Sequence, residues 1–561
     1  MPDSGQGMNM RKRQIFLIFF CYIVLIGTSF YRPLVMKRIM DQGMMAKDFQ
    51  VILIFSGVLF ALAVLEEALN ILQAKLFTDL QNSVILNLYT KVFQRLLYAK
   101  MEYFSHNNSV EIMNRISTDI GGVGTLVDSS VMSIISYVLQ IISGIIGLFV
   151  IDWKLAVLVL AIVPVKYLLI RFFSKRKEEA VAEWIQESTD FSAWFGDTIN
   201  GMREVKLWNL YKKERRELRR RQKKVLELGK RSNLLETYNL SGDSILQWTV
   251  TSALYGIGGY LICGGSLTIG GLTAFISYSN YVIGPIALVF NLKFLFAQVK
   301  PSAKRLREFF KLETEKPSKP GQDIKELKEE IRFENVDFAY EDQPVLKDIS
   351  LKIRKGEKIA IIGDNGSGKS TLISLLLRFL KPGKGSIYLD GKEIEEYDLG
   401  EYRDLFGVVS QDIYLFKDTV KANIAMGRKI DDEEMDRTCK MMNMQEFIGK
   451  LPQGYETRLE KNGENLSGGE RQKIALLRAI IKKSPILVLD EATANIDKKY
   501  NELLHYNILK DFPDKTLIVI THKTENLAGM DRIYEIQNHA IKECDYAELE
   551  KSAFVHQKKK G

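Results

Sequence analysis

Apolar and polar positions divide the chain into two parts. Between residues 14 and 298 long apolar runs recur, whereas from residue 325 to residue 561 the apolar runs are short and are separated by glycine-rich and charged loops. A helix that crosses a membrane needs roughly 20 apolar residues, and short apolar runs between turn signals are typical of buried strands. The pattern therefore predicts a membrane part followed by an α/β part.

Six of the apolar runs are long enough to cross a membrane. The clearest are "IISYVLQIISGIIGLFVI" (Ile134–Ile151) and "LAVLVLAIVPVKYLLI" (Leu155–Ile170). A single weak run could be a buried helix of a soluble domain, but six such runs favour a membrane domain. We predict spans at residues 14–37, 50–73, 128–151, 155–173, 245–264 and 271–296.

Basic residues give the orientation of these spans. "MRKRQ" (Met10–Gln14) precedes the first span and "RFFSKRKEE" (Arg171–Glu179) follows the fourth, so the even-numbered crossings return to the cytoplasm. The long charged segments 74–127 and 174–244 have helical periodicity and are predicted to continue the spans into the cytoplasm. We expect a multi-pass protein of the cytoplasmic (inner) membrane with most of its other mass in the cytoplasm.

Composition narrows the function classes. With 561 residues the chain exceeds one ordinary hydrophobic core. The basic flanks account for the net charge of +9, and we find no basic patch interleaved with aromatic residues, so nucleic acid is not expected as a partner. The cysteines (Cys21, Cys263, Cys439 and Cys544) have no paired spacing, which argues against a disulfide framework and a zinc site.

The α/β part contains a phosphate-binding loop. "EKIAIIGDNGSGKSTLISLLLRFL" (Glu357–Leu380) predicts a strand, a glycine loop and a helix, and the loop matches G-x-x-x-x-G-K-[ST]. Glycines allow the backbone to wrap phosphates, a lysine meets the β and γ charges, and a hydroxyl reaches Mg²⁺. These roles fall on Gly363, Gly366, Gly368, Lys369 and Ser370.

A second predicted strand ends in two acids. "PILVLDEATANID" (Pro485–Asp497) is apolar as far as Asp490 and Glu491. Asp490 is placed to hold Mg²⁺ through its water shell, and Glu491 could polarise the attacking water. Such a strand end alone is more often a solvated edge, but together with the phosphate loop it predicts a site of nucleotide hydrolysis.

A second loop also suits an anion. "NLSGGERQKIAL" (Asn465–Leu476) places a serine and two glycines at the start of a predicted helix, where backbone N–H groups and the helix dipole favour negative charge. The chain already has a phosphate loop, so this second loop calls for a separate explanation.

The order of these motifs resembles the ATP-binding cassette family, specifically exporters in which a membrane domain precedes the nucleotide domain. "LSGGE" (Leu466–Glu470), between the phosphate loop and the acid-ended strand, is the most specific element. The resemblance implies a six-helix all-α transmembrane domain (1–312), a linker (313–328) and an α/β P-loop cassette (329–561). It also implies ATP and Mg²⁺ as cofactors, and two cassettes paired head to tail, so that the signature loop of one caps the ATP of the other.

The resemblance assigns further residues one by one. Tyr340 matches the aromatic residue that stacks on adenine. Gln411, in "VVSQDIYLF", matches the glutamine that senses Mg²⁺ and the attacking water, and His522, in "VITHK", matches the switch histidine at the γ-phosphate. The resemblance thus predicts Glu491, His522 and Gln411 as catalytic and Ser370, Gln411 and Asp490 as metal-binding. The predicted nucleotide-binding residues are Tyr340, Gly363, Asp364, Asn365, Gly366, Ser367, Gly368, Lys369, Ser370, Thr371, Leu466, Ser467, Gly468, Gly469, Glu470 and Asp497.

Three departures from the family pattern are visible. The signature ends in Glu470 where glutamine is commoner, and "ANID" follows Glu491 in place of the commoner form. In "LEKNG" (Leu459–Gly463), Lys461 stands where many exporters have an acidic residue that faces the coupling loops. The first two leave hydrolysis intact, while the third puts family details of coupling in doubt. Segments 102–120 and 199–214 resemble the two coupling regions.

Two acidic residues in a predicted span bear on the cargo. Glu66 and Glu67 lie within the second predicted span, so one hypothesis is that an acid lines the cavity and favours cationic cargo such as a basic peptide. The alternative, slightly favoured, is that these acids are hydrated or paired with an arginine. We expect an ATP-driven exporter of a peptide or amphipathic molecule that works with a second copy, or a homologous half-transporter, in membrane lipid. A lipid flippase and an exporter-fold importer remain alternatives.

Overall fold

The computed structural model describes residues 4–127, 129–286, 292–315, 321–341, 343–491, 498–521 and 524–545. The chain forms two compact units. The first contains residues 1–96 and 110–312, and the second contains residues 97–109 and 313–561. Segment 97–109, which the sequence analysis placed in the membrane domain, groups with the second unit because a bridge joins Ala99 to Thr314.

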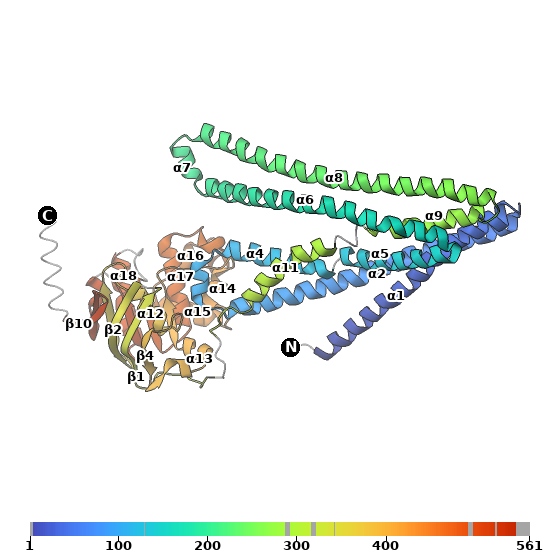
Figure 1. Cartoon of the computed structure of the whole chain (residues 1–561). Helices are drawn as coiled ribbons and strands as arrows, with labels where there is room; N and C mark the ends of the chain where they lie inside the picture. Colours follow the sequence, from blue (N-terminus) through green and yellow to red (C-terminus); the bar gives the residue numbers. More distant parts are fainter. Residues whose placement is uncertain are drawn as a thin grey trace. The chain divides into compact units, whose positions relative to one another are not determined.

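Long helices make up the first unit (Figure 1). Its π-helical turn Ile39–Met44 follows the first helix directly. The helices are α1 (Ser4–Arg38), α2 (Phe49–Leu97), α4 (Ser109–Gly124), α5 (Ser129–Ile151), α6 (Trp153–Asn200), α7 (Met202–Leu207), α8 (Tyr211–Cys263), α9 (Ile269–Ile283) and α11 (Leu292–Phe309).

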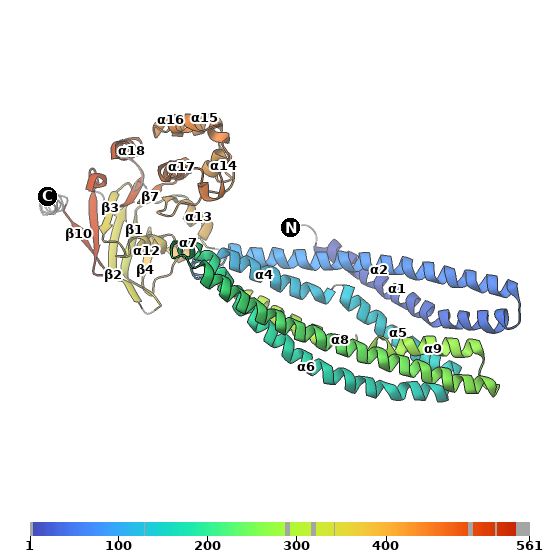
Figure 2. The ribbon, with the colours of Figure 1, turned by 90° about the horizontal axis from the view of Figure 1, so that it is seen from above.

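The predicted extension of the spans beyond the bilayer agrees with the helix lengths. Helix α2 has 49 residues and α6 has 48. At 1.5 Å per residue each is roughly 70 Å long, more than twice the apolar thickness of a bilayer. Helices α6 and α8 lie side by side, and α7 joins their far ends (Figures 1 and 2).

Four helical segments of the described chain are long and apolar enough to cross a membrane, namely Arg13–Met44, Phe49–Leu97, Val131–Ile151 and Trp153–Asn200. They contain the first four predicted spans, apart from residues 128–130. The fifth predicted span lies in α8, which is not one of these four segments because polar residues lower the mean hydropathy of its apolar run. The sixth is not one continuous helix, because α9 ends at Ile283 and Gly284 and Pro285 form a turn. Residues 287–291 of that span lie outside the described residues.

The second unit contains two sheets, as expected for an α/β cassette. A four-stranded antiparallel sheet has the order β2-β1-β4-β5. Its strands are β1 (Glu330–Tyr340), β2 (Gln343–Arg354), β4 (Lys384–Leu389) and β5 (Lys392–Glu393). A six-stranded sheet has the order β10-β9-β3-β8-β7-β6, parallel except at β10. Its strands are β3 (Lys358–Gly363), β6 (Phe406–Val409), β7 (Ile486–Asp490), β8 (Thr516–Ile520), β9 (Arg532–Gln537) and β10 (Ala540–Cys544).

Helices and single turns connect and cover these strands (Figure 2). The helices are α3 (Met101–His106), α12 (Lys369–Leu376), α13 (Leu399–Asp404), α14 (Val420–Ala425), α15 (Asp432–Met441), α16 (Gln445–Lys450), α17 (Gly468–Ile481) and α18 (Lys498–Asp511). The buried strands β7 and β8 have no exposed position, which fits their continuous apolar sequence in a sheet covered on both faces.

The parallel sheet positions the predicted site. The carboxyl ends of parallel strands meet at one edge, where ligands bind in open α/β sheets. The phosphate loop follows β3, Gln411 comes two residues after β6, and Asp490 is the last residue of β7. Residues far apart in the sequence therefore gather at one edge.

Candidate nucleotide site

The phosphate loop has a backbone that requires glycine. Gly363, Gly366 and Gly368 have φ values of +149°, +82° and +102°, a region that residues with a side chain rarely adopt. A Cβ at Gly363 would lie 2.5 Å from the carbonyl oxygen of Ile536, and one at Gly368 would lie 2.8 Å from Leu346. Two of the three glycines are thus needed for space as well as for conformation.

Lys369 begins helix α12 and is almost fully buried. Its Nζ atom donates to the carbonyl oxygens of Gly363 and Asp364, both at 2.8 Å, so the ammonium group is held inside the loop that it follows. Asp364 and Asn365 are exposed and Thr371 is buried. The hydroxyl of Ser367 is buried with no hydrogen-bond partner in the described part of the chain. A buried hydroxyl without a partner in such a loop is suited to a ligand oxygen.

Asp490 and Ser370 meet beside this loop. The side chain of Ser370 hydrogen-bonds Asp490, and burial raises the pKa of the Asp490 carboxyl, with Ser370 and Lys369 opposing that shift. Asp490 Oδ1 is buried and has no hydrogen-bond partner among the residues that the structure describes. Oxygen ligands of this kind are those that Mg²⁺ prefers, so the two side chains present fit the predicted metal.

Gln411 and Glu491 are also brought together. Gln411 Nε2 donates to Glu491 Oε2 at 3.0 Å, although the two residues are 80 positions apart. Glu491 adopts a left-handed backbone with φ +49°, which turns the chain sharply after β7. Ser370, Gln411 and Asp490 line one cavity of about 780 Å³ in the second unit. The structure therefore brings Ser370, Gln411, Asp490 and Glu491 together at the sheet edge.

Tyr340 lies at the end of β1 and is half-exposed. Its ring meets that of Phe338 edge to face, with 4.9 Å between the ring centroids. This arrangement holds one edge of the tyrosine ring while part of the side chain stays accessible, as stacking on an adenine requires.

The signature loop begins helix α17 with a capping box. Ser467 Oγ accepts from the backbone N–H of Glu470, and Glu470 Oε2 accepts from the N–H and the hydroxyl of Ser467, both at 2.8 Å. Glu470, the residue that departs from the family pattern, thus secures the helix start. The backbone N–H groups of the two glycines lie in the positive first turn.

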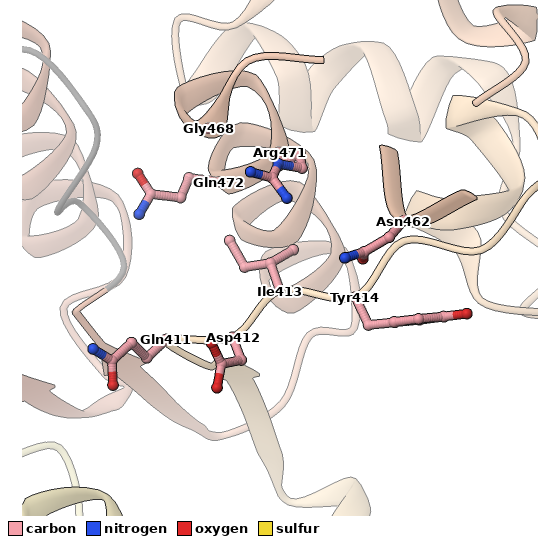
Figure 3. A pocket seen from close by; sticks show the side chains of 8 residues that line it. All are labelled: Gln411, Asp412, Ile413, Tyr414, Asn462, Gly468, Arg471 and Gln472. Carbon is pink, nitrogen blue, oxygen red and sulfur yellow. The ribbon is translucent and has the colours of Figure 1, made fainter. Parts of the chain in front are cut away.

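A further cavity of about 500 Å³ adjoins this helix start (Figure 3). Figure 3 shows side chains from α17 and from the loop after β6 around this space. The lining residues are Gln411, Asp412, Ile413, Tyr414, Asn462, Gly468, Arg471 and Gln472. Of these, only Gln411 and Gly468 are predicted site residues; the others lie within the quoted segments 408–416, 459–463 and 465–476 and have no predicted role.

Two predicted site residues, Asp497 and His522, lie outside the described residues. Lys461, the third departure, begins a short 3-10 turn (Lys461–Gly463) and is exposed. Neighbouring Asn462 accepts a hydrogen bond from the backbone of Leu415, which ties this turn to the loop after β6.

In the membrane unit, Glu66 lies 3.5 Å from Arg32 Nη1, so the arginine-paired alternative holds for this residue. Glu67 is exposed and forms no ion pair within the described part of the chain. Lys166 of α6, to which no predicted role was assigned, is fully buried and lies 2.6 Å from Asp243 of α8. A lysine inside an otherwise apolar run was the available signal.

Comparison with known proteins identifies the class. The model of the ABC transporter transmembrane region matches residues 15–286, and the ABC transporter model matches residues 346–494. The chain belongs to the ATP-binding cassette transporters. It joins an exporter-type membrane domain to an ATP-binding cassette in one chain, and it is a membrane-spanning ATPase that couples ATP hydrolysis to transport. The predicted family, fold class and enzyme class are confirmed.

Relatives match over nearly their whole length. The ABC transporter ATP-binding protein YwjA of Bacillus subtilis is 29% identical over 539 residues, covering 95% of this chain and 93% of the relative. A multidrug export ATP-binding/permease protein by name, from Staphylococcus aureus, is 28% identical over 559 residues, 97% of each chain. The solved structure of a bacterial Atm1-family ABC exporter with ATP bound matches with a TM-score of 0.80 at 22% sequence identity. The match covers 97% of this chain and 96% of that chain. This structural match supports the exporter fold described above.

Proposed function

We propose that two copies of this chain form one transporter that exports an amphipathic cargo across the cytoplasmic membrane, driven by ATP. The observation that carries the dimer is the presence of two separate helix starts suited to phosphate, at α12 and α17. Among the described residues that line the cavity containing Ser370 and Asp490, none belongs to the signature loop. The signature of one copy is therefore proposed to cap the ATP on the phosphate loop of the other.

The chemistry at each ATP follows from the side chains. Lys369 would contact the β- and γ-phosphates and Tyr340 the adenine. Ser370 and Asp490 would hold Mg²⁺, which neutralises charge on the phosphate oxygens when bound. Glu491 is the proposed general base, since a carboxylate there can take the proton of the attacking water. The amide of Gln411 holds that carboxylate in place.

Transport is proposed to follow alternating access. Two bound ATP close the cassettes, the helices open the cavity outward, and hydrolysis returns them. Names of relatives such as YgaD of Bacillus subtilis, 27% identical over 553 residues, describe multidrug export, and they support a drug-like amphipathic cargo. A peptide remains within this class.

The dimer can be tested by complementation between two defective chains. Lys369→Met disables the phosphate loop, and Ser467→Arg disables the signature. If each ATP lies between two chains, a mixed dimer of these variants contains one intact site and traps nucleotide with vanadate, while neither variant alone does so. Absence of trapping in mixed dimers that remain folded would show that each site belongs to one chain.

The transport activity needs a separate test. Wild-type protein in lipid nanodiscs and in proteoliposomes would be assayed with cationic peptides, hydrophobic dyes and labelled lipids, with Glu491→Gln as the blank. ATP-dependent accumulation of dyes or peptides in inside-out vesicles supports export. Leaflet exchange of lipids alone identifies a flippase, and movement in the reverse direction identifies an importer. Both results contradict the proposed export.

A further inference from the structure

Lys166 is a charged residue buried within the membrane unit. It lies in α6 inside the predicted span 155–173, two residues after Pro164, and its side chain has no exposed surface. A charge at membrane depth is unfavourable unless it is paired, and such residues mark functional positions by default.

The ammonium group of Lys166 contacts two other helices. Its Nζ atom lies 2.6 Å from Asp243 Oδ1 of α8 and also donates to the carbonyl oxygen of Ile283, the last residue of α9. The last carbonyl groups of a helix have no partner within it, so Lys166 satisfies one of these groups. A single side chain therefore links α6, α8 and the end of α9.

Helix α8 presents a polar stripe at the same level. Asn239, Asp243 and Gln247 recur at intervals of four residues, which places them on one helix face. Gln247 Nε2 donates to Asn280 Oδ1 of α9 at 3.3 Å, so the last turn of α9 is held at two points. Asn239 Oδ1 and Asp243 Oδ1 are both buried, and neither has a hydrogen-bond partner among the described residues, so Asp243 contacts Lys166 as an ion pair.

Packing on the other side of α9 is apolar and close. Tyr278 is fully buried and donates to the carbonyl oxygen of Phe30 in α1. A Cβ at Gly147 of α5 would lie 2.5 Å from the Tyr278 ring. Helix α9 thus lies between a close-packed contact with α1 and α5 and a polar contact with α6 and α8.

Stability alone is a weak reason for the ion pair. Desolvation of two charges offsets much of their attraction, and replacing such a pair by apolar residues of similar size is often neutral or stabilising, whereas removing one partner strands a charge. A role in fixing the positions of helices explains why the chain keeps the pair.

The helix pair provides a route for movement. Helix α7, in the segment that resembles the second coupling region, joins the far ends of α6 and α8 (Figure 1). Ion pairs between Lys224 and Glu187 and between Arg231 and Glu183 hold α6 and α8 together along this length. This pairing gives a displacement of α7 a path along both helices to the level of Lys166.

We propose that Lys166 is a positioning residue of transport: with Asp243 and the Ile283 carbonyl it clamps the end of α9 to the α6–α8 pair, so that these three helices move as one body during the ATP cycle. This inference rests on the proposed export function, because it identifies the contact that carries movement of α7 to the end of α9.

The test compares single and double variants. Lys166→Met and Asp243→Leu each strand one charged partner and are expected to lower the melting temperature. The double variant removes both charges and is expected to regain most of that loss. Lys175→Met, an exposed lysine on the same helix, is the control. Asp243→Asn keeps the size of the side chain, and it replaces the double variant in the distance measurement if the double variant does not fold.

The decisive readout is coupling. In the double variant, cargo transported per ATP hydrolysed is expected to fall at least about fivefold, the lower end of ordinary coupling between sites, with basal ATP turnover retained. In a cysteine-free background, spin labels at Leu168 and Ser277 report the α6–α9 distance in nucleotide-free protein and in ATP-bound Glu491→Gln protein. The distance stays constant in wild type and broadens or shifts in the double variant.

A folded double variant with wild-type transport per ATP and an unchanged label distance would overturn the clamp. If wild-type protein exports none of the probes, the proposed export fails, yet the label distances still decide the clamp. Broadening in the variant supports it, and identical distances in both proteins overturn it. When only Asp243→Asn folds, the same two distance outcomes apply to that variant.

Discussion

The two anion-binding loops of the cassette and the Lys166 site of the membrane unit differ in how their polar groups find partners. In the cassette, Lys369 bonds carbonyl groups five and six residues before it, and Ser467 bonds Glu470 three residues after it. In the membrane unit, Lys166 bonds the carbonyl of Ile283, 117 positions away. Short-range chemistry leaves a pattern in the sequence, whereas contacts between distant helices do not.

The difference also concerns what a polar group does. Cassette side chains at the sheet edge are arranged for a ligand, since Ser367 Oγ and Asp490 Oδ1 are buried without hydrogen-bond partners within the described chain. In the membrane unit, Lys166 is satisfied by protein groups on two helices. Asn239 Oδ1 of the membrane unit also lacks a hydrogen-bond partner among the described residues, so the contrast concerns these particular side chains: we infer that Ser367 and Asp490 are available for a ligand and that Lys166 fixes helix positions.

The largest expected effect concerns the proposed base. Glu491→Gln should lower ATP turnover by about 10²–10⁴-fold, because the water loses its proton acceptor, while ATP binding is retained. Steady-state ATPase assays and nucleotide binding measure both. Glu446→Gln, an exposed glutamate of α16, is the matched control and should turn over like wild type. Substantial turnover in Glu491→Gln would move the base to another residue.

A substitution in the phosphate loop tests how far local backbone geometry determines the structure of the nucleotide site. Gly368→Ala should lower the free energy of unfolding of the protein by about 1–3 kcal/mol, because φ is +102° and the new Cβ meets Leu346. ATP affinity should fall as the loop shifts. Thermal unfolding with and without ATP provides the measurement.

Gly366→Ala separates the two causes of that effect. Its φ of +82° is also left-handed, but nothing lies within 4 Å of the new Cβ. It should show the backbone strain alone and unfold less easily than Gly368→Ala. Equal losses for the two variants would mean that the contact with Leu346 adds nothing.

Variants of Glu66 and Glu67 in α2 test whether ion pairing decides the role of a charged side chain in the membrane unit. Arg32 already compensates Glu66, and such partly exposed pairs contribute at most about 1 kcal/mol, so Glu66→Gln should change the KM for a cationic dye by less than about fivefold. Glu67 is exposed and has no ion pair among the described residues, so Glu67→Gln should raise that KM more. Dye transport in proteoliposomes measures both, and unchanged KM values for both variants would remove the acids from cargo selection.

The smallest effect is expected at the signature. A glutamine can also complete a capping box, so Glu470→Gln should leave the melting temperature unchanged. It removes a negative charge beside the phosphate proposed to bind there, an effect of about 0.3–1 kcal/mol, and should lower the KM for ATP. Glu464→Gln, exposed just before the signature, is the control. A higher KM in Glu470→Gln would show that the carboxylate itself assists binding.

Much of the cassette could be predicted because each motif is a short run with its own secondary structure. The strand, loop and helix around Gly363–Ser370 fall where the pattern predicts, and Asp490 ends a strand as expected. The sixth span was predicted as one apolar run, but its helix ends at Ile283, because Gly284 and Pro285 favour a turn that apolar character alone does not reveal.

The sequence by itself determined the two-part organisation, the phosphate loop, the acid-ended strand and the signature, because apolar period, glycine spacing and helix caps act over a few residues. Only the tertiary structure decided that Gln411 bonds Glu491, that Glu66 pairs with Arg32 and that Lys166 joins three helices. These contacts depend on how strands align in the sheet and how helices pack, and no local spacing in the chain encodes either.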